Sequence, residues 1–196
     1  MRVALLSLFM AVFSLTASAQ DAPTAQAEAS KATPSTKLEA FSARTGIVVV
    51  KAYSTLGVVN GLGRVSVDAR EFRDASNPKQ AQYGVAFEVK ETGRIERENT
   101  SFVDEDEIDS LIRGLEYISK IDKSITTLSN FEAQFRTKGD LSMTVFSGRG
   151  GEISLAVASG RIGKTNAFLK LGDAEQIKQL LVQAKSVIAA AKQSAR

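Results

Sequence analysis

The stretch Asp104–Ile121, DEDEIDSLIRGLEYISKI, is where the hydrophobic period of the sequence changes, and it decides the fold that we predict. Its apolar residues recur at helical spacing and form one stripe, which predicts an amphipathic helix. A second stretch, Asp173–Ile188, reads DAEQIKQLLVQAKSVI and has the same pattern. Each apolar position of the first stripe stands 69 residues before its counterpart in the second stripe. The first stripe consists of Ile108, Leu111, Ile112, Leu115 and Ile118, and the second of Ile177, Leu180, Leu181, Ala184 and Val187. This constant spacing favours an internal duplication.

Both predicted helices follow segments in which apolar and polar residues alternate, as in strands with one buried face. In the first half these segments lie around residues 47–52, 65–69, 83–89 and 94–102, and in the second around 131–135, 141–145, 153–157 and 166–171. Short gaps with turn residues separate most of them, which favours antiparallel meanders.

We therefore predict an α+β fold that consists of a duplicated β4α unit, with repeats at 41–121 and 125–192. Each antiparallel sheet is covered by one helix, and the halves are related by a pseudo-twofold axis around a shared core. Two curved sheets or one continuous sheet would both fit the pattern, and unrelated β4α stretches could also look alike. Asp104 with Glu107, and Asp173 with Gln176, have the spacing of capping boxes, so we expect the helices to begin there.

The N-terminal 19 residues predict a secretory signal peptide. Arg2 is followed by an apolar run that ends in Ala17-Ser18-Ala19, a small-x-small cleavage site. The run is shorter than the roughly 20 residues that a membrane-spanning helix needs. We expect cleavage near Ala19-Gln20 and a periplasmic or secreted protein that does not span the membrane, with a disordered linker at 20–40 and a single α+β domain at 41–196.

The composition excludes several classes of catalytic site. The chain contains no His and no Cys, so Ser-His and Cys-His nucleophile systems and His- or thiolate-ligated zinc are ruled out. Carboxylate chemistry remains, but no pair of acids stands out. We assign no catalytic, cofactor-binding or metal-binding residue and predict that the protein is not an enzyme.

One motif resembles a phosphate-binding loop. Residues 158–165 read ASGRIGKT, close to the pattern G-x-x-x-x-G-K-[ST]. A true phosphate-binding loop leads into a long helix whose N-terminus receives the anion. Here an alternating segment follows Thr165, so we interpret the motif as a hairpin turn between the last two strands.

The acidic run 104–109 has two interpretations. Acids in the first turn of a helix are stabilised by the helix dipole without a ligand. Calcium also takes oxygen ligands of this kind, although the run does not match the EF-hand loop. The sequence does not decide between these interpretations.

Charge is distributed unevenly along the chain. Residues 88–109 hold nine acids and three bases, whereas residues 161–196 hold seven bases and two acids. These two patches meet each other or face different partners. A possible interaction surface comprises Arg149, beside a glycine-rich turn, together with Arg161, Lys164, Lys178, Lys185 and Lys192.

The resulting functional hypothesis is an exported, non-catalytic binding or interaction module of the bacterial cell envelope. Its partner would be a protein, a glycan or a small apolar ligand. The order of two β4α units resembles that of the PUR-alpha and Whirly modules, which implies single-stranded nucleic-acid binding on a sheet surface as an alternative. Such binders need aromatic platforms on a basic face, whereas this chain has no Trp and three Tyr, so nucleic acid is disfavoured. A carboxylate-dependent hydrolase is the other alternative.

Overall fold

The computed structural model describes residues 33–94 and 96–194, so the predicted signal peptide and most of the predicted linker lie outside the described residues. A short helix, α1 (Lys37–Ser42), precedes four strands that form an antiparallel meander. These strands are β1 (Val49–Gly61), β2 (Gly63–Asp74), β3 (Ala81–Glu91) and β4 (Arg97–Asp104). A 3-10 turn (Glu105–Glu107) then leads into helix α2 (Ile108–Ile118).

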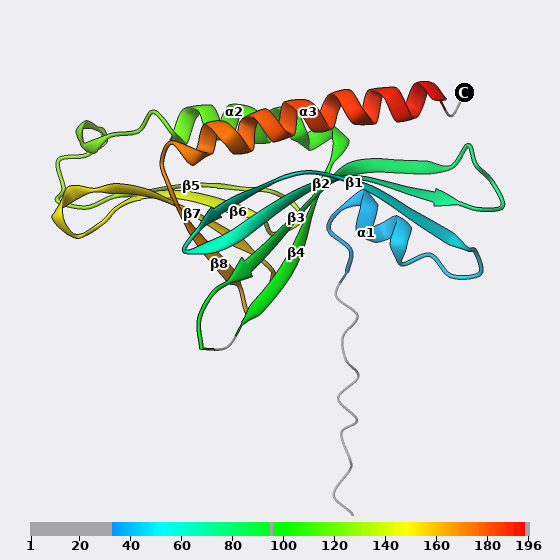
Figure 1. Cartoon of the computed structure of the whole chain (residues 1–196), viewed down its shortest axis with the longest axis horizontal. Helices are drawn as coiled ribbons and strands as arrows, with labels where there is room; N and C mark the ends of the chain where they lie inside the picture. Colours follow the sequence, from blue (N-terminus) through cyan, green and yellow to red (C-terminus); the bar gives the residue numbers. More distant parts are fainter. Residues whose placement is uncertain (1–32, 95, 195–196) are drawn as a thin grey trace, which may run out of the picture. The chain divides into compact units, whose positions relative to one another are not determined.

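The second half repeats this order. Its strands form another four-stranded antiparallel meander, and they are β5 (Glu132–Arg136), β6 (Ser142–Ser147), β7 (Ile153–Ser159) and β8 (Thr165–Lys170). Helix α3 (Asp173–Ser194) follows the last strand (Figure 1). Two four-stranded antiparallel sheets, each followed by a helix, confirm the predicted α+β class and are consistent with a duplicated β4α unit.

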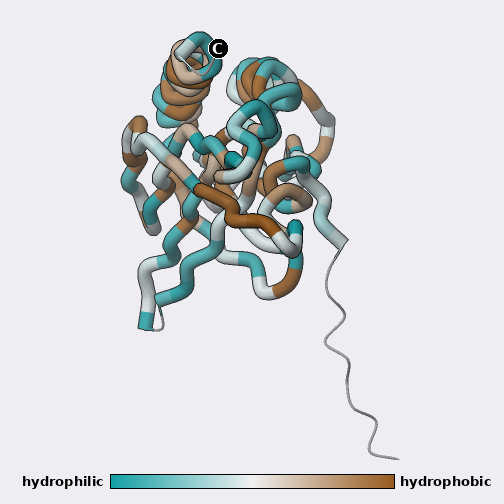
Figure 2. The backbone as a smooth tube through the Cα atoms, turned by 90° about the vertical axis from the view of Figure 1, so that its right-hand side faces the viewer, coloured by the Kyte–Doolittle hydropathy of each residue, from teal (hydrophilic) through white to brown (hydrophobic). Residues whose placement is uncertain are grey.

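The helices lie side by side, and each packs on the sheet of the other half (Figures 1 and 2). Helix α3 contacts β1, β2 and β3, while α2 contacts β5 and β6. Two glycines mark these crossings: a Cβ on Gly57 in β1 would meet Leu180 of α3 at 2.7 Å, and a Cβ on Gly114 in α2 would overlap the Phe135 ring of β5. The two halves therefore share a single core.

The core is built from the inner faces of both sheets and from the helical stripes. Both stripes are buried over most of their length, although in α3 the final buried position is Ile188 rather than the predicted Val187. The first sheet contributes Val65, Val67, Val85, Phe87, Val89 and Val103, and the second contributes Met143, Val145, Leu155, Val157, Ala167 and Leu169. Burial of these side chains is the main source of stability, because each contributes roughly 1.5–3 kcal/mol relative to full exposure.

A polar seam joins the two sheets. The main chains of Leu62 and Phe168 exchange two hydrogen bonds of 2.8 Å, which brings the β1–β2 turn against β8. The hydroxyl oxygens of Ser101 and Ser159 lie 2.8 Å apart and are buried. Nearby, Asn99 donates to the hydroxyl of Thr165 at 2.7 Å. These bonds satisfy polar groups that would be costly to bury alone.

Several boundaries differ from the sequence prediction, most of all those of the first strand and of the linker. The strand expected at 47–52 runs instead from Val49 to Gly61. This strand, β1, forms the edge of its sheet, and its residues 50–55 are exposed on both faces. An edge strand of this kind shows no alternation, so its length leaves no signal in the sequence. The predicted linker at 20–40 also ends too late, since α1 begins at Lys37 and buries Leu38.

The expected capping boxes do not form. The Asp104 side chain makes no bond to its own helix, which begins at Ile108 after the 3-10 turn. Helix α3 does begin at the expected Asp173, but Gln176 donates to the carbonyl oxygen of Val58 at 3.4 Å rather than capping. Within residues 33–94 and 96–194, no helix has the length and apolar content needed to cross a membrane.

Candidate binding groove

One surface feature is a free stretch of sheet edge at the start of β3, next to helix α1. Strand β4 ends at Asp104, which lies opposite Gly84, whereas β3 extends three residues further, to Ala81. Residues 81–83 still pair with β2 on their other side. These three residues therefore form a sheet edge from which the next strand has turned away.

The hydrogen-bond alternation shows which main-chain groups face this open edge. Asp74 N–H donates to the carbonyl oxygen of Gln80 at 3.1 Å, so Gln80 points towards β2. Because successive residues of an antiparallel strand point to opposite sides, Gln82 also points towards β2 while Ala81 and Tyr83 point to the open edge. No described strand pairs with Ala81 on that side, whereas Tyr83 lies next to Glu105, the first residue of the 3-10 turn, because the pairing of β3 with β4 ends at Gly84 and Asp104.

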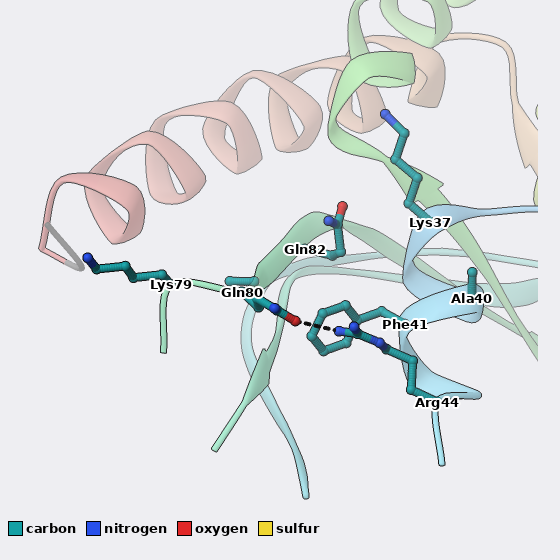
Figure 3. Close-up of a pocket in the computed structure, with 8 residues that line it drawn as sticks. Lys37, Ala40, Phe41, Arg44, Lys79, Gln80 and Gln82 are labelled. Atoms are coloured by element: carbon teal, nitrogen blue, oxygen red, sulfur yellow. Dashed lines mark hydrogen bonds between the residues drawn. The ribbon is translucent and has the colours of Figure 1, made fainter. Parts of the chain in front are cut away.

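Three cavities surround this edge, and together we call them the β3-edge groove. A cavity of about 640 Å³ lies between α1 and the start of β3 (Figure 3). Two further cavities, of about 500 and 470 Å³, lie towards the C-terminal end of α3. The residues that recur among the three linings are Lys37, Lys79, Ala81, Gln82, Tyr83, Glu105 and Lys192.

Helix α1 forms one wall of the groove and is fixed by Asp104. The buried carboxylate of Asp104 accepts from the main-chain N–H groups of Lys37 at 2.8 Å and Leu38 at 3.2 Å. A capping box between Thr36 and Glu39 closes the same helix end. The residue that we expected to cap α2 therefore caps α1, which is distant in the sequence and forms one wall of the groove.

The wall beside α1 is basic. The cavity between α1 and β3 is lined by three cationic side chains, Lys37, Arg44 and Lys79, and by no acid. Arg44 lies 5.0 Å from the Phe41 ring centre and donates to the side-chain oxygen of Gln80 at 2.9 Å. Lys79 is exposed, and no described acid pairs with it.

The wall beside α3 is formed by ion pairs. Lys192 contacts Glu105 at 2.9 Å, and its ammonium lies 5.7 Å from the ring centre of Tyr83. Burial, reinforced by the charge of Glu71, raises the pKa of Tyr83 above its ordinary value. Across the groove, the hydrogen bond between Lys37 and Asp106 at 2.8 Å raises the pKa of the lysine and lowers that of the carboxyl. These shifts keep Tyr83 and Lys37 protonated and Asp106 ionised near neutral pH.

The lysines of the predicted interaction surface form a ladder with the acids of the first half. Lys178 pairs with Glu116 at 3.5 Å, and Lys185 with Asp109 at 2.5 Å. With the Lys192 pair, these contacts show that α3 runs antiparallel to α2. The basic and acidic patches seen in the sequence thus meet each other, and of these three lysines it is Lys192 and Lys185 that line the groove.

The remaining members of that predicted surface lie apart from the groove, in two loops. Arg161 bonds to Asp140 at 2.8 Å and to the main-chain oxygen of Thr33 at 3.2 Å. Lys164 is exposed in the connection between β7 and β8. Arg149 begins the 3-10 turn Arg149–Gly151, and its side chain is not among those described.

The phosphate-loop-like motif is a turn between strands. Thr165, the last residue of ASGRIGKT, begins β8 rather than a helix, and its side chain is fully buried against Asn99. Gly160 and Gly163 have φ values of 108° and 65°, which only glycine adopts readily. The motif therefore shapes a tight connection, as predicted.

The acids of the run 104–109 do not converge on one point. Their partners lie on different elements: Asp104 binds α1, Glu105 pairs with Lys192, Asp106 with Lys37 and Asp109 with Lys185. Glu107 accepts from the main-chain N–H of Lys138 at 3.0 Å. In the described part of the chain, no three acids gather in a way that could hold a metal ion.

Comparison of the chain with profiles of known protein families, with curated proteins and with solved structures gives no significant match.

Proposed function

We propose that this protein is an exported, non-catalytic interaction module of the bacterial cell envelope, and that it binds a segment of another protein in the β3-edge groove. The observation that carries the proposal is the free edge of β3 at residues 81–83, open to cavities on both sides. Unpaired main-chain groups on a sheet edge are a ready template for an added strand.

The lining of the groove favours a protein over the other partners considered. The cavity beside α1 presents three cations and two glutamines, with Ala40, Phe41 and Ala81 as its apolar side chains, so it suits a polar ligand better than a small apolar one. A glycan would gain little from strand-edge main-chain groups spaced to match a polypeptide.

The ionisation of the carboxyl groups favours binding over catalysis. A catalytic acid that works near neutral pH needs a raised pKa. Here hydrogen bonds lower the pKa of five carboxyl groups, those of Asp74, Glu96, Asp106, Asp122 and Asp140. This pattern supports a non-catalytic module over the hydrolase alternative.

The nucleic-acid alternative receives less support from the sheet surfaces. Phe146 and Phe168 are neighbouring aromatic residues of the second sheet, but their rings pack edge to face with centroids 6.2 Å apart. Phe146 is only partly accessible, so the pair does not offer two open faces for base stacking.

A site-specific crosslinking experiment tests the binding proposal in the native host. A photoreactive amino acid replaces Gln82 in one variant and Lys164, which is exposed outside the groove, in the other. We expect a discrete crosslinked protein from position 82 and none from position 164. Equal products from both positions, or none from position 82 under repeated irradiation, would refute a partner in the groove.

The proposed location has its own test. Export with cleavage near Ala19-Gln20 predicts that the protein isolated from its host begins at Gln20 and is found in the periplasmic or extracellular fraction. Intact-mass measurement of the fractionated protein checks this expectation. A full-length chain in the cytosolic fraction would contradict it.

A further inference from the structure

We propose that the ligand of the β3-edge groove is an extended acidic peptide, which adds to β3 as a short strand and places its carboxylates against Arg44 and Lys79. This inference rests on the proposed function and names the chemical class of the partner. Two independent observations point to it: the orientation of the main-chain groups at the edge, and the charge of the wall beside α1.

The main chain supplies the binding frame. Ala81 directs its N–H donor and its C=O acceptor into the groove, and Tyr83, the next residue that faces this edge, lies beside Glu105 of the 3-10 turn. A peptide lying antiparallel to β3 would continue the line of β4 beyond Asp104, where the chain itself turns away into Glu105–Glu107. The vacant position is therefore that of a short fourth strand.

The side chains supply the preference for acidic residues. Alternate side chains of an added strand project to the same face, so every second residue would face α1. Beside α1, Arg44 is held by Phe41 and Gln80, whereas Lys79 extends away from Arg44 on the other side of Gln80, and no described acid pairs with it (Figure 3). A pre-positioned guanidinium and an unpaired ammonium both suit carboxylates.

The turn before β3 holds Lys79 in place. The carboxylate of Asp74 accepts from Ser76 N–H at 2.8 Å and from its hydroxyl at 2.6 Å. Gln80 N–H donates to the carbonyl oxygen of Asn77 at 2.8 Å. The backbone that carries Lys79 is thus ordered before a ligand arrives, which reduces the entropic cost of binding.

Amide hydrogen exchange of the purified protein without ligand tests the frame. We expect the N–H group of Ala81 to exchange rapidly and that of Gln82 to be protected by its bond to β2. Equal protection of both would show that the edge is already occupied, and would overturn the inference.

Peptide binding tests the charge preference. The probes are fluorescein-labelled octapeptides of alternating Asp and Val, Ser and Val, or Lys and Val, titrated with the purified protein and followed by fluorescence anisotropy. We expect saturable binding of the Asp peptide alone, with a Kd on the order of 10 μM, weakened as salt rises because exposed charges are screened. Indistinguishable binding of the three peptides, or no binding of the Asp peptide, would overturn the inference.

Three variants locate the binding site. Lys79→Glu reverses a charge inside the groove and should weaken binding at least about tenfold, whereas Lys164→Glu, the same reversal on a distant loop, should change it less than about twofold. Ala81→Pro removes the outward N–H without breaking a bond to β2, so it should weaken binding while leaving the melting temperature nearly unchanged. Equal effects of the two charge reversals would refute the assigned site.

Three results separate the possible failures. If dextran sulfate displaces the Asp peptide completely and Ala81→Pro binds as well as the wild type, the groove holds anions without adding a strand, and the inference fails. If a protein crosslinks at position 82 while no acidic peptide binds, the proposed function stands and the acidic preference is wrong. If no partner crosslinks in the host although the Asp peptide binds as predicted, the proposed function fails while the chemistry of the groove stands.

Discussion

At the residue scale, Asp104 connects the architecture to the groove. Asp104 is 2% exposed, and its carboxylate takes both of its hydrogen bonds from the first turn of α1. A negative charge at a helix N-terminus is favoured by the helix dipole as well as by the exposed N–H groups. Through Asp104 the end of β4 therefore holds α1, and α1 in turn holds Arg44.

Replacing this carboxylate should destabilise the protein and loosen the groove. Asp104→Ala leaves two N–H groups of α1 without acceptors, so we expect a loss of about 1–3 kcal/mol in the free energy of unfolding. The control Asp109→Ala removes only an exposed ion pair with Lys185, and should cost less than about 1 kcal/mol. Urea denaturation of both variants measures the difference, and equal losses would contradict the role given to Asp104.

Asp140 makes the stability depend on pH. The hydrogen bond from Arg161, supported by Arg136 and opposed by burial, lowers the pKa of Asp140 below the ordinary 3.8. A lowered pKa in the folded state means that its contribution is complete above 3.8 and is lost as the pH falls through the folded value.

The variant Asp140→Asn tests this assignment. Asn also tolerates the positive φ of 59° at this position, so the backbone should be unaffected. We expect the variant to be less stable than the wild type at pH 7 and the gap to narrow in acid below the ordinary carboxyl pKa. Urea denaturation across this range measures the gap, and a gap that widens in acid would show the sign to be wrong.

At the scale of elements, the two helices are held by contacts that only small residues permit. In α2, Gly114 lets the helix approach the Phe135 ring, and in β1, Gly57 makes room for Leu180. A glycine inside a helix costs about 1 kcal/mol relative to alanine, so its presence in α2 reflects close packing rather than helix propensity.

A larger side chain at position 114 should therefore push α2 away from the second sheet, on which it packs. Gly114→Val places a branched side chain where the Phe135 ring already lies, and we expect a loss of about 2 kcal/mol or more. Arg113→Val introduces the same residue on an exposed part of the helix and should cost less than about 1 kcal/mol. Thermal unfolding compares the two variants. A melting temperature for Gly114→Val no lower than for the control would contradict the close packing of α2 on the Phe135 ring.

The sequence predicted the secondary-structure elements better than the contacts between them. The alternation in β2, β3 and β6 and both helical stripes were sufficient for the element types and for the two meanders. Nothing local indicated that Asp104 would bind Lys37 and Leu38, since the partners stand more than 60 residues apart. The groove was missed for the same reason. Residues 81–83 form a free edge only because β4 ends opposite Gly84, and the sequence of neither strand alone predicts how the two strands pair.

At the scale of the whole described domain, the two β4α units exchange their helices, because each helix packs on the sheet of the other unit. Each sheet leaves its apolar face open to the helix of the other half, and the Lys178, Lys185 and Lys192 ladder sets the antiparallel pairing of the helices. Because α3 extends over the first sheet, its C-terminal end reaches Tyr83 and closes one side of the groove. The candidate site thus depends on both halves.

Nuclear Overhauser effects from the Leu180 methyl groups test this exchange most directly. The account predicts strong cross-peaks to the α protons of Gly57 in β1, together with cross-peaks between the Phe135 ring and the α protons of Gly114. Leu180 cross-peaks confined to β5–β8, with Phe135 near α3 instead of α2, would show that each helix covers its own sheet and would contradict the account.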